Sequence, residues 1–501
     1  MKTKTRVETD SLGGVQVPAD SLYGAQTVRA IDNYPISGLR AHPIFIRSYA
    51  LLKLACAEAN ASLGLIPATI GRAIVRAAKE VASGLYRDQF VVDVYQAGAG
   101  VSFHMNVNEV IANLAILHLR PRRGTPARLG DHTLVHPNDH VNFGQSTNDT
   151  FPTAARLAAL LLLEELYPAL EALERAFGRK AAEFDGILKS GRTHLQDAVP
   201  IRLGQEFAAY NEALRQAREH LRSSAESLRQ LGIGGSAAGT GLNVHPRFRL
   251  MVIARLKQLT KLKLDAAPDL RAAMQSQLPL AAVSSALRNL ALELIRIAND
   301  LRLLASGPVT GLSEIVLPPV QPGSSIMPGK VNPAMLELLD MVAFQVVGCD
   351  TVVALAVQAG QLELNVMMPA MVWNLLHAIE ILKNSCRVVA DRCIAGIRAN
   401  REICERYAWR TPSLATALNP VIGYDRAAEI VKKALASGKT IPEVCLEENV
   451  LSREELDRRL DPHRMTEPGV SHGRRVRARS ASSQRAGRTR RKPSKPTELS
   501  S

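Results

Sequence analysis

The sequence predicts a mainly α-helical protein organised around a central bundle of long helices. Hydrophobic residues make up 46% of the 501 residues and aromatic residues only 4%. This Leu- and Ala-rich balance is typical of long packed helices rather than of β-sandwiches. From Pro152 to about Ala399, apolar residues recur at i, i+3, i+4 and i+7, as in Phe207–Leu231 and Leu280–Ser306. Several helices of this length imply a bundle.

Turns and apolar periodicity divide the chain into three domains and a tail. An N-terminal domain (residues 1–142) mixes Gly- and Pro-rich turns with helices, and a central domain (143–400) carries the bundle. A small helical C-terminal domain (401–467) precedes the tail (468–501). The elements expected, in order, are helices at Ile44–Leu63 and Ile70–Gly84, a helix opening at Pro152, the helix Phe207–Leu231, a glycine-rich break at Gly232–Gly241, the helix Leu280–Ser306, and short helices at Ala427–Ala436, Ile441–Glu447 and Arg453–Leu460.

The tail holds most of the excess positive charge. From Ser471 to Ser501, ten Lys and Arg residues stand against one acid, Glu498, so this segment carries +9 of the net +15 and leaves +6 for the rest. The tail is rich in Ser and Pro with almost no large apolar side chains, so we expect a solvated, disordered extension. The alternative is nonspecific contact with a polyanion through its phosphates.

Sequence features also indicate a cytoplasmic protein without a membrane span. The N-terminus, MKTKTRVETD, lacks the apolar region of a secretory signal. The strongest apolar run, Leu157–Leu163, is soon interrupted by Glu164 and is too short to span a bilayer. The six cysteines form no CxxC pair and no zinc-ligand spacing, so we expect buried reduced thiols. There is also no HExxH motif and no P-loop, so no metal or organic cofactor is expected.

The segment most informative about chemistry is residues 323–333, GSSIMPGKVNP. Its glycines permit positive φ angles and its prolines cannot continue a helix, so it predicts a loop. Such a loop exposes backbone N–H groups to an anion, and Lys330 adds a positive charge. A Ser- and Gly-rich surface turn is the alternative for this segment taken alone.

Three further segments, interpreted as loops, carry polar residues of the same kind. QAGAGVSFHMNVNEVIAN at 96–113 presents Ser102, His104, Asn106 and Asn108. HVNFGQSTNDTFPT at 140–153 presents Ser146, Thr147, Asn148 and Asp149 before Pro152, and the free N–H groups of a helix start there would attract a carboxylate. GRTHLQDAVPIRLGQEF at 191–207 presents Thr193, His194 and Gln196. Each alone has a structural alternative, such as a Ser-Thr-Asn-Asp helix cap.

Taken together, the four segments resemble, in order and spacing, those that line the active site in the fumarase/aspartase superfamily. The resemblance runs from about Arg6 to about Asp461 and omits only the tail. It implies a three-domain fumarase/aspartase-like fold, with a homotetramer whose sites are shared between subunits. The sequences at 6–31, 193–200 and 299–308 resemble aspartate ammonia-lyases more than fumarases. The implied reaction is elimination of ammonia from L-aspartate to give fumarate.

The resemblance also assigns roles within this site. It implies that Ser324 is the base that removes the β-hydrogen, that His194 acts on the leaving-group side, and that Glu337 orients His194. Removal of that hydrogen places charge beside a carboxylate, which preorganised donors must hold. The substrate-binding residues are expected to be Ser146, Thr147, Asn148, Thr193, Ser325, Lys330 and Asn332.

Three departures from the family pattern leave the substrate open. Val101 stands where aspartase-like sites carry Thr near the leaving amine, His104 replaces a usual Asn, and Val309 replaces a usual Arg. A missing hydroxyl facing a buried polar group costs about 1–3 kcal/mol, enough to redirect substrate choice. The alternatives are therefore a class II fumarate hydratase, a lyase for a modified aspartate, and a non-catalytic family member used as a binding protein.

Overall fold

The computed structural model describes residues 4–119 and 128–469. The chain divides into two compact units: Met1–Lys189 with Arg202–Tyr407, and Ser190–Ile201 with Ala408–Ser501. The division into three domains at residues 142 and 400 stays a prediction. The basic tail lies outside the described residues except for 468 and 469, and so does the predicted polyanion contact.

The architecture is mainly α-helical, which confirms the predicted fold class. The strands are short and form four two-stranded pairs: β1 (Thr5–Asp10) with β2 (Gly13–Pro18), β3 (Leu188–Thr193) with β4 (Gln196–Arg202), β5 (Gln230–Leu231) with β6 (Asp265–Ala266), and β7 (Ile315–Val316) with β8 (Arg398–Ala399). The α-helices are α1 (Ala25–Asn33), α2 (Pro43–Ser62), α3 (Ala68–Ala82), α4 (Val101–His118), α5 (Thr147–Glu183), α6 (Leu203–Ala225), α7 (Phe248–Thr260), α8 (Leu270–Gln275), α9 (Leu278–Leu304), α10 (Ala334–Gln358), α11 (Met368–Arg392), α12 (Arg401–Arg410), α13 (Asn419–Ile422), α14 (Tyr424–Ser437), α15 (Ile441–Glu447) and α16 (Arg453–Arg459).

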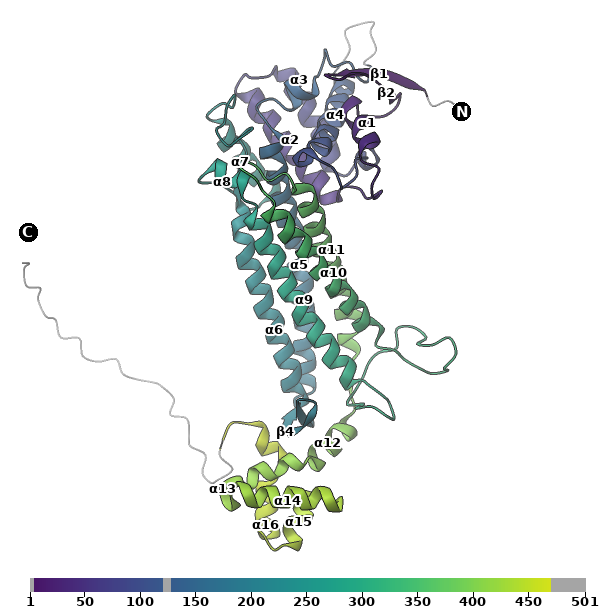
Figure 1. The fold of residues 1–501 in the computed structure, drawn as a ribbon, viewed down its shortest axis with the longest axis vertical. Coiled ribbons are helices and arrows are strands. Elements are labelled where there is room, and N and C mark those ends of the chain that lie inside the picture. Colours follow the sequence, from purple (N-terminus) through teal and green to yellow (C-terminus); the bar gives the residue numbers. More distant parts are fainter. Residues whose placement is uncertain (1–3, 120–127, 470–501) are drawn as a thin grey trace, which may run out of the picture. The chain divides into compact units, whose positions relative to one another are not determined.

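Five long helices of the first unit, α5, α6, α9, α10 and α11, run side by side as the bundle that the apolar periodicity predicts (Figure 1). Their facing stripes bury Leu and Ala side chains, with few rings among them. The predicted glycine-rich break lies between β5 and α7, and the predicted helices of the first 84 residues and of the second unit are present within a few residues of their expected bounds. All six cysteines are buried and free, as predicted.

Two helices in the described part of the chain, α9 and α10, are long and apolar enough to cross a membrane. Only 44% and 33% of the relevant stretches are buried within the chain. The core helix of a soluble protein passes the same test of length and composition, and both helices pack against each other in the bundle. The outer faces of both helices therefore expose apolar side chains, as surfaces that contact another molecule do.

Two sequence interpretations are wrong. Residues 96–100 form a loop, but residues 101–113 belong to helix α4. This helix is buried on every side, so its polar residues do not line a surface loop. Its polar residues are buried, and several are hydrogen-bonded: Asn106, for example, accepts from the Val91 N–H and donates to the Gln89 carbonyl. Gly100 has φ +94°, and a β-carbon there would overlap the ring of Phe151, so only glycine fits this turn.

The helix expected to open at Pro152 instead begins at Thr147, so Pro152 lies inside α5. Ser146 is its N-cap, in a capping box with Asp149. Ser146 Oγ accepts from the Asn148 N–H at 3.2 Å, and Asp149 Oδ1 accepts from the Ser146 N–H at 3.0 Å. These two bonds satisfy the backbone N–H groups of Ser146 and Asn148. A helix that began at Pro152 would not have capped these N–H groups. The structural alternative for this segment, a helix cap, is therefore confirmed.

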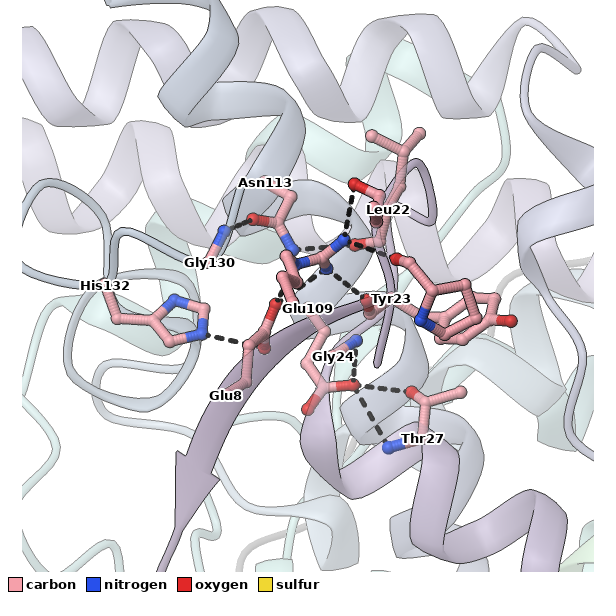
Figure 2. A network of polar contacts seen from close by, with 12 residues as sticks. Glu8, Leu22, Tyr23, Gly24, Thr27, Glu109, Asn113, Gly130 and His132 are labelled. Carbon is pink, nitrogen blue, oxygen red and sulfur yellow. Dashed lines mark hydrogen bonds and ion pairs between the residues drawn. The ribbon is translucent and has the colours of Figure 1, made fainter. Parts of the chain in front are cut away.

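A buried polar network fixes α4 to the N-terminal segments (Figure 2). The carboxylate of Glu109, in α4, accepts from the N–H groups of Gly24 and Thr27 and from the Thr27 hydroxyl, at 2.9, 3.1 and 2.6 Å, and so caps the start of α1. Burial raises the pKa of Glu109, and these donors oppose that shift. Burial also opposes ionisation of Glu8, but hydrogen bonds from His132 and Arg6 outweigh it and lower its pKa. The bonds of Glu109 fix α4 to the start of α1 and to the loop at Gly24.

Candidate active site

The 323–333 loop is closed by its own backbone. The Gly323 N–H donates to the Lys330 carbonyl at 3.0 Å, and Asn332 Nδ2 donates to the Gly323 carbonyl at 2.6 Å. A β-carbon at Gly323 would overlap the Lys330 carbonyl, so the closure requires glycine. Lys330 is exposed. The predicted loop is thus present.

Within this loop, two backbone N–H groups hold the Ser324 hydroxyl oxygen. Its Oγ accepts from the backbone N–H groups of Ile326 at 3.2 Å and Met327 at 2.9 Å. Donors to an oxygen stabilise its deprotonated form and lower the cost of forming an alkoxide. Ser324 is half-buried and Ser325 is exposed. Glu337 is half-buried in the first turn of α10, directly after the loop.

The start of α5 holds the second group of predicted residues. Thr147 is buried, while the Asn148 amide donates to the Ala237 carbonyl at 2.8 Å. Asp149 Oδ2 accepts from the N–H groups of Gly234 and Ser236 at 3.0 and 3.1 Å. Burial raises the pKa of Asp149 to about 6, although these N–H donors lower it. Asn148 and Asp149 therefore hold the glycine-rich segment in place, and Ser146 caps the start of α5.

Next to Thr147 lie two buried residues, His104 and Lys53, which the sequence alone did not place together. His104 Nδ1 lies 2.7 Å from Thr147 Oγ1, and His104 Nε2 lies 2.7 Å from Lys53 Nζ. His104 entered the sequence analysis only as a departure from the family pattern, and Lys53 was missed. The available signal was a lysine in the middle of an apolar helix, IFIRSYALLKLACAEA, where a charge is rarely buried without partners.

Thr193 and His194 lie on the β3–β4 hairpin and belong to the second unit, whereas the other predicted site residues belong to the first. His194 and Leu195 form its turn, with φ angles of +56° and +59°. Two positive φ angles define a type I′ turn, which normally selects Asn and Gly. Both side chains are exposed. A histidine held in this backbone conformation, at the tip of a hairpin, is consistent with a functional residue.

The first unit places its two groups of predicted residues at opposite ends of the bundle. Helix α5 has 37 residues, so Thr147 lies about 55 Å from its far end. At that far end, Phe184 packs edge-on against Phe207, with ring centroids 5.2 Å apart. The loop starts there too, because Lys189 joins Glu206 of α6, at 2.8 Å, to Glu314, at 3.0 Å.

Ten residues separate Glu314 from Ser324, and they span about 35 Å when fully extended. The structure therefore does not bring Ser324 and Thr147 together within one chain. Of the three departures, Val101 is the first residue of α4 and 45% exposed, and Val309 is 89% exposed. Among the described residues, no group of three or more His, Cys, Asp or Glu side chains is arranged to hold a metal ion.

Comparison with known proteins covers nearly the whole described chain. The family described as "Lyase" matches residues 13–348, and "Fumarase C C-terminus" matches residues 414–467. The chain is 46% identical to the aspartate ammonia-lyase of Bacillus subtilis, covering 93% of this chain and 97% of that protein. It is 47% identical to the class II fumarate hydratase of Thermus thermophilus, covering 92% and 98%.

Solved structures agree with these sequence relatives. The fumarate lyase:delta crystallin of Brucella melitensis, solved with bound cobalt, has a TM-score of 0.88 at 46% identity over 93% of this chain and 100% of that one. The class II fumarase of Schistosoma mansoni has a TM-score of 0.89 at 38% identity over 92% and 99%. Relatives of nearly equal identity thus include a carbon–nitrogen lyase and a carbon–oxygen lyase.

Proposed function

This chain belongs to the fumarase/aspartase superfamily of lyases, and we propose that it is an aspartate ammonia-lyase, which converts L-aspartate into fumarate and ammonia by anti elimination. The observation that carries the proposal is the pair of backbone N–H donors on Ser324 Oγ. A lyase of this kind needs a strong base, and a serine provides one only where its alkoxide is stabilised. The sequences of residues 6–31, 193–200 and 299–308 resemble those of aspartate ammonia-lyases and support the choice of aspartate.

In the proposed reaction, Ser324 removes the β-hydrogen, and the electron pair moves toward the adjacent carboxylate. Loop N–H groups hold the charge that develops there. The hydroxyls of Thr147 and Ser325 bind the same carboxylate in the ground and transition states. Lys330 and Asn332, with Thr193, hold the other carboxylate. The remaining assignments follow the family: His194 acts on the amine side and Glu337 orients it. Ser146 and Asn148 serve mainly by shaping the start of α5, where their side chains are engaged.

We also propose that the protein is a homotetramer with sites completed by neighbouring subunits. Because Thr147 and Ser324 lie at opposite ends of one bundle, each site needs the other group from a second chain. The outer face of α10 exposes the apolar side chains Met341, Phe344 and Leu355 at 63%, 57% and 60%, and that of α9 exposes Leu292 at 49%. Packing of bundles along these faces would cover them. Light scattering on the active enzyme would contradict this if it gave the mass of one chain.

Product identification separates the candidate substrates. Fumarate is incubated with ammonium, and separately with water alone, and the products are identified by chromatography and mass spectrometry. Aspartate from the first mixture supports the proposal. Malate without aspartate would instead make the protein a class II fumarate hydratase, the second candidate, which Val101 favours because valine offers no hydroxyl to an amine. Reaction of fumarate only with a substituted amine would support a lyase for a modified aspartate.

Two neighbouring serines test the base. Ser324→Ala should lower kcat by orders of magnitude while folding and assembly persist, because a loop hydroxyl contributes little burial. Ser325→Ala, the matched control in the same loop, should mainly raise KM, because it removes a donor to a carboxylate that is present in both ground and transition states. Both variants are measured in the fumarate-amination and aspartate-deamination directions. If Ser324→Ala kept its turnover, the base would lie elsewhere.

A further inference from the structure

The buried polar cluster behind Thr147 draws residues from three segments. Lys53 lies in α2, His104 in α4, and Asn142 and Gln145 just before α5. Lys53 Nζ lies 2.7 Å from His104 Nε2, 2.9 Å from Asn142 Oδ1 and 2.9 Å from Gln145 Oε1. His104 Nδ1 lies 2.7 Å from Thr147 Oγ1.

Hydrogen accounting in this cluster fixes the direction of each bond. Below its pKa of about 7, Lys53 is an ammonium with three N–H groups and no acceptor, so Asn142 Oδ1, Gln145 Oε1 and His104 Nε2 must each accept one. A neutral imidazole that accepts at Nε2 carries its hydrogen at Nδ1. His104 Nδ1 therefore donates to Thr147 Oγ1. The hydroxyl, already accepting, keeps its own hydrogen for another acceptor.

The charge state of His104 agrees with this accounting. Burial first, and then the charge of Lys53, lower the pKa of His104 well below 6.5, although a hydrogen bond with Asn142 opposes the shift. The imidazole is therefore neutral and holds a single ring hydrogen. The ring of Tyr49, with its centroid 5.4 Å from that of His104, packs beside the imidazole and restricts its rotation. Among the described residues, no acceptor within the protein takes the Thr147 hydrogen.

We propose that His104 is a positioning residue that, held by Lys53 in the Nδ1–H tautomer, turns the Thr147 hydroxyl so that its hydrogen points to a substrate carboxylate. The inference rests on the proposed function, because the acceptor it names is the dicarboxylate of that reaction. It gives a role to one of the three departures from the family pattern. Histidine replaces the usual asparagine at position 104, and its ring N–H provides the hydrogen-bond donor to Thr147.

Two substitutions at position 104 separate its two hydrogen bonds. An asparagine amide nitrogen lies near the position of Nδ1 and keeps a donor to Thr147. A glutamine amide reaches the position of Nε2 and keeps an acceptor for Lys53, but leaves nothing at Nδ1. Measured below pH 7, where Lys53 is an ammonium, His104→Asn should therefore stay within about twofold of the wild-type KM for fumarate. His104→Gln should raise KM about tenfold with little change in kcat, and should weaken succinate binding, measured by calorimetry, by the same factor.

A double-mutant cycle asks whether the effect passes through Thr147. If it does, His104→Gln should change succinate binding about tenfold in the wild type and hardly at all in Thr147→Val, which has no hydroxyl to orient. A merely structural role for His104 would give the same factor in both backgrounds, and that result would overturn the inference. Wild-type protein that bound neither fumarate nor succinate would overturn the proposed function as well, so the two failures are distinguishable.

A second pair of variants tests the tautomer if His104→Gln does not fold. In Lys53→Met, nothing requires Nε2 to be the acceptor, so His104 can receive a hydrogen from Thr147 and KM should rise severalfold. Adding His104→Asn should restore KM, because an amide nitrogen donates whatever its surroundings. Failure of the added asparagine to restore KM in folded, assembled protein would contradict the role of Lys53. Circular dichroism and light scattering establish folding and assembly for each variant.

Discussion

Lys53 should contribute to the free energy of unfolding a term that rises with pH between 7 and 9, and its removal should abolish that contribution. Its ammonium group is fully buried in α2, and burial lowers its pKa from 10.5 to about 7, which Cys56 and Asp149 only partly oppose. In the unfolded chain the same side chain is hydrated. Between pH 7 and 10.5 the unfolded state therefore holds a proton that the folded state has lost, and the free energy of unfolding increases with pH.

The magnitude follows from the two pKa values. At about 1.4 kcal/mol per pH unit, the difference between 10.5 and 7 corresponds to about 5 kcal/mol, a cost that is complete below pH 7 and is relieved as the pH rises. Of the other titratable groups that face Lys53, Asp149 and His104 are silent in this window, while Cys56 and Tyr49 titrate only in the unfolded chain and add the same opposing slope to wild type and variant. Burial raises the pKa of Asp149 only to about 6, lowers that of His104 well below 6.5, and raises those of Tyr49 and Cys56. From pH 7.5 to 9 the expected gain is about 2 kcal/mol.

The assay compares wild type with Lys53→Met by urea unfolding, followed by circular dichroism at pH 7.5, 8, 8.5 and 9 and at one protein concentration. Lys79→Met, at an exposed position of α3, is the control for loss of a surface lysine. The prediction concerns the slope, because methionine also leaves three buried acceptors without a donor, each at about 1–3 kcal/mol at every pH. A difference between wild type and Lys53→Met that stayed constant within about 0.5 kcal/mol, near the precision of such extrapolations, would refute the reasoning.

Two further predictions concern the ends of the bundle. Lys189→Met should lower the free energy of unfolding by about 1.5–3 kcal/mol, because it removes a charged hydrogen-bond donor from the buried Glu314 carboxylate, and Lys189→Met with Glu314→Gln should recover part of that loss in denaturant titrations. Val101→Thr should improve aspartate turnover if the substrate is aspartate, because it restores a hydroxyl for the amine at nearly unchanged volume. Reduced turnover of aspartate, with another amine or hydroxy acid better accepted by the wild type, would show that Val101 packs against an apolar substituent.

Apolar periodicity predicted the bundle well because long helices repeat one physical requirement many times. Leu280–Ser306 was expected and Leu278–Leu304 is observed, since a stripe of buried leucines leaves little freedom in placing the element. The interpretation of residues 96–113 failed for the opposite reason. Asn106 and Asn108 look like loop residues when only their polarity is considered, and only the tertiary structure provides the buried backbone partners that Asn106 uses. The short β-strands were missed because two to seven residues carry too little periodicity.

The candidate site was predictable as a set of residues but not as an arrangement. Resemblance and loop chemistry named Ser324 and Thr147, yet nothing in one sequence states that a 37-residue helix separates them. The separation of Ser324 from Thr147 along the bundle is an argument for the assembly of several chains. A chain whose base and carboxylate donor lie at opposite ends of a bundle cannot build a site alone, whereas bundles packed side by side in opposite directions place the two ends together.

The start of α4 decides how far the family's chemistry carries over to this chain. Val101 and His104 lie one helical turn apart, so they face the same side of the helix. One has lost a hydroxyl that would meet an amine, and the other supplies an imidazole N–H to the hydroxyl that meets a carboxylate. The two changes act on different parts of the substrate. Binding of the dicarboxylate skeleton should therefore be retained, while the leaving group is recognised with one fewer polar contact. A substrate screen that varies the leaving group at a constant four-carbon skeleton is where this protein and a typical aspartate ammonia-lyase should differ.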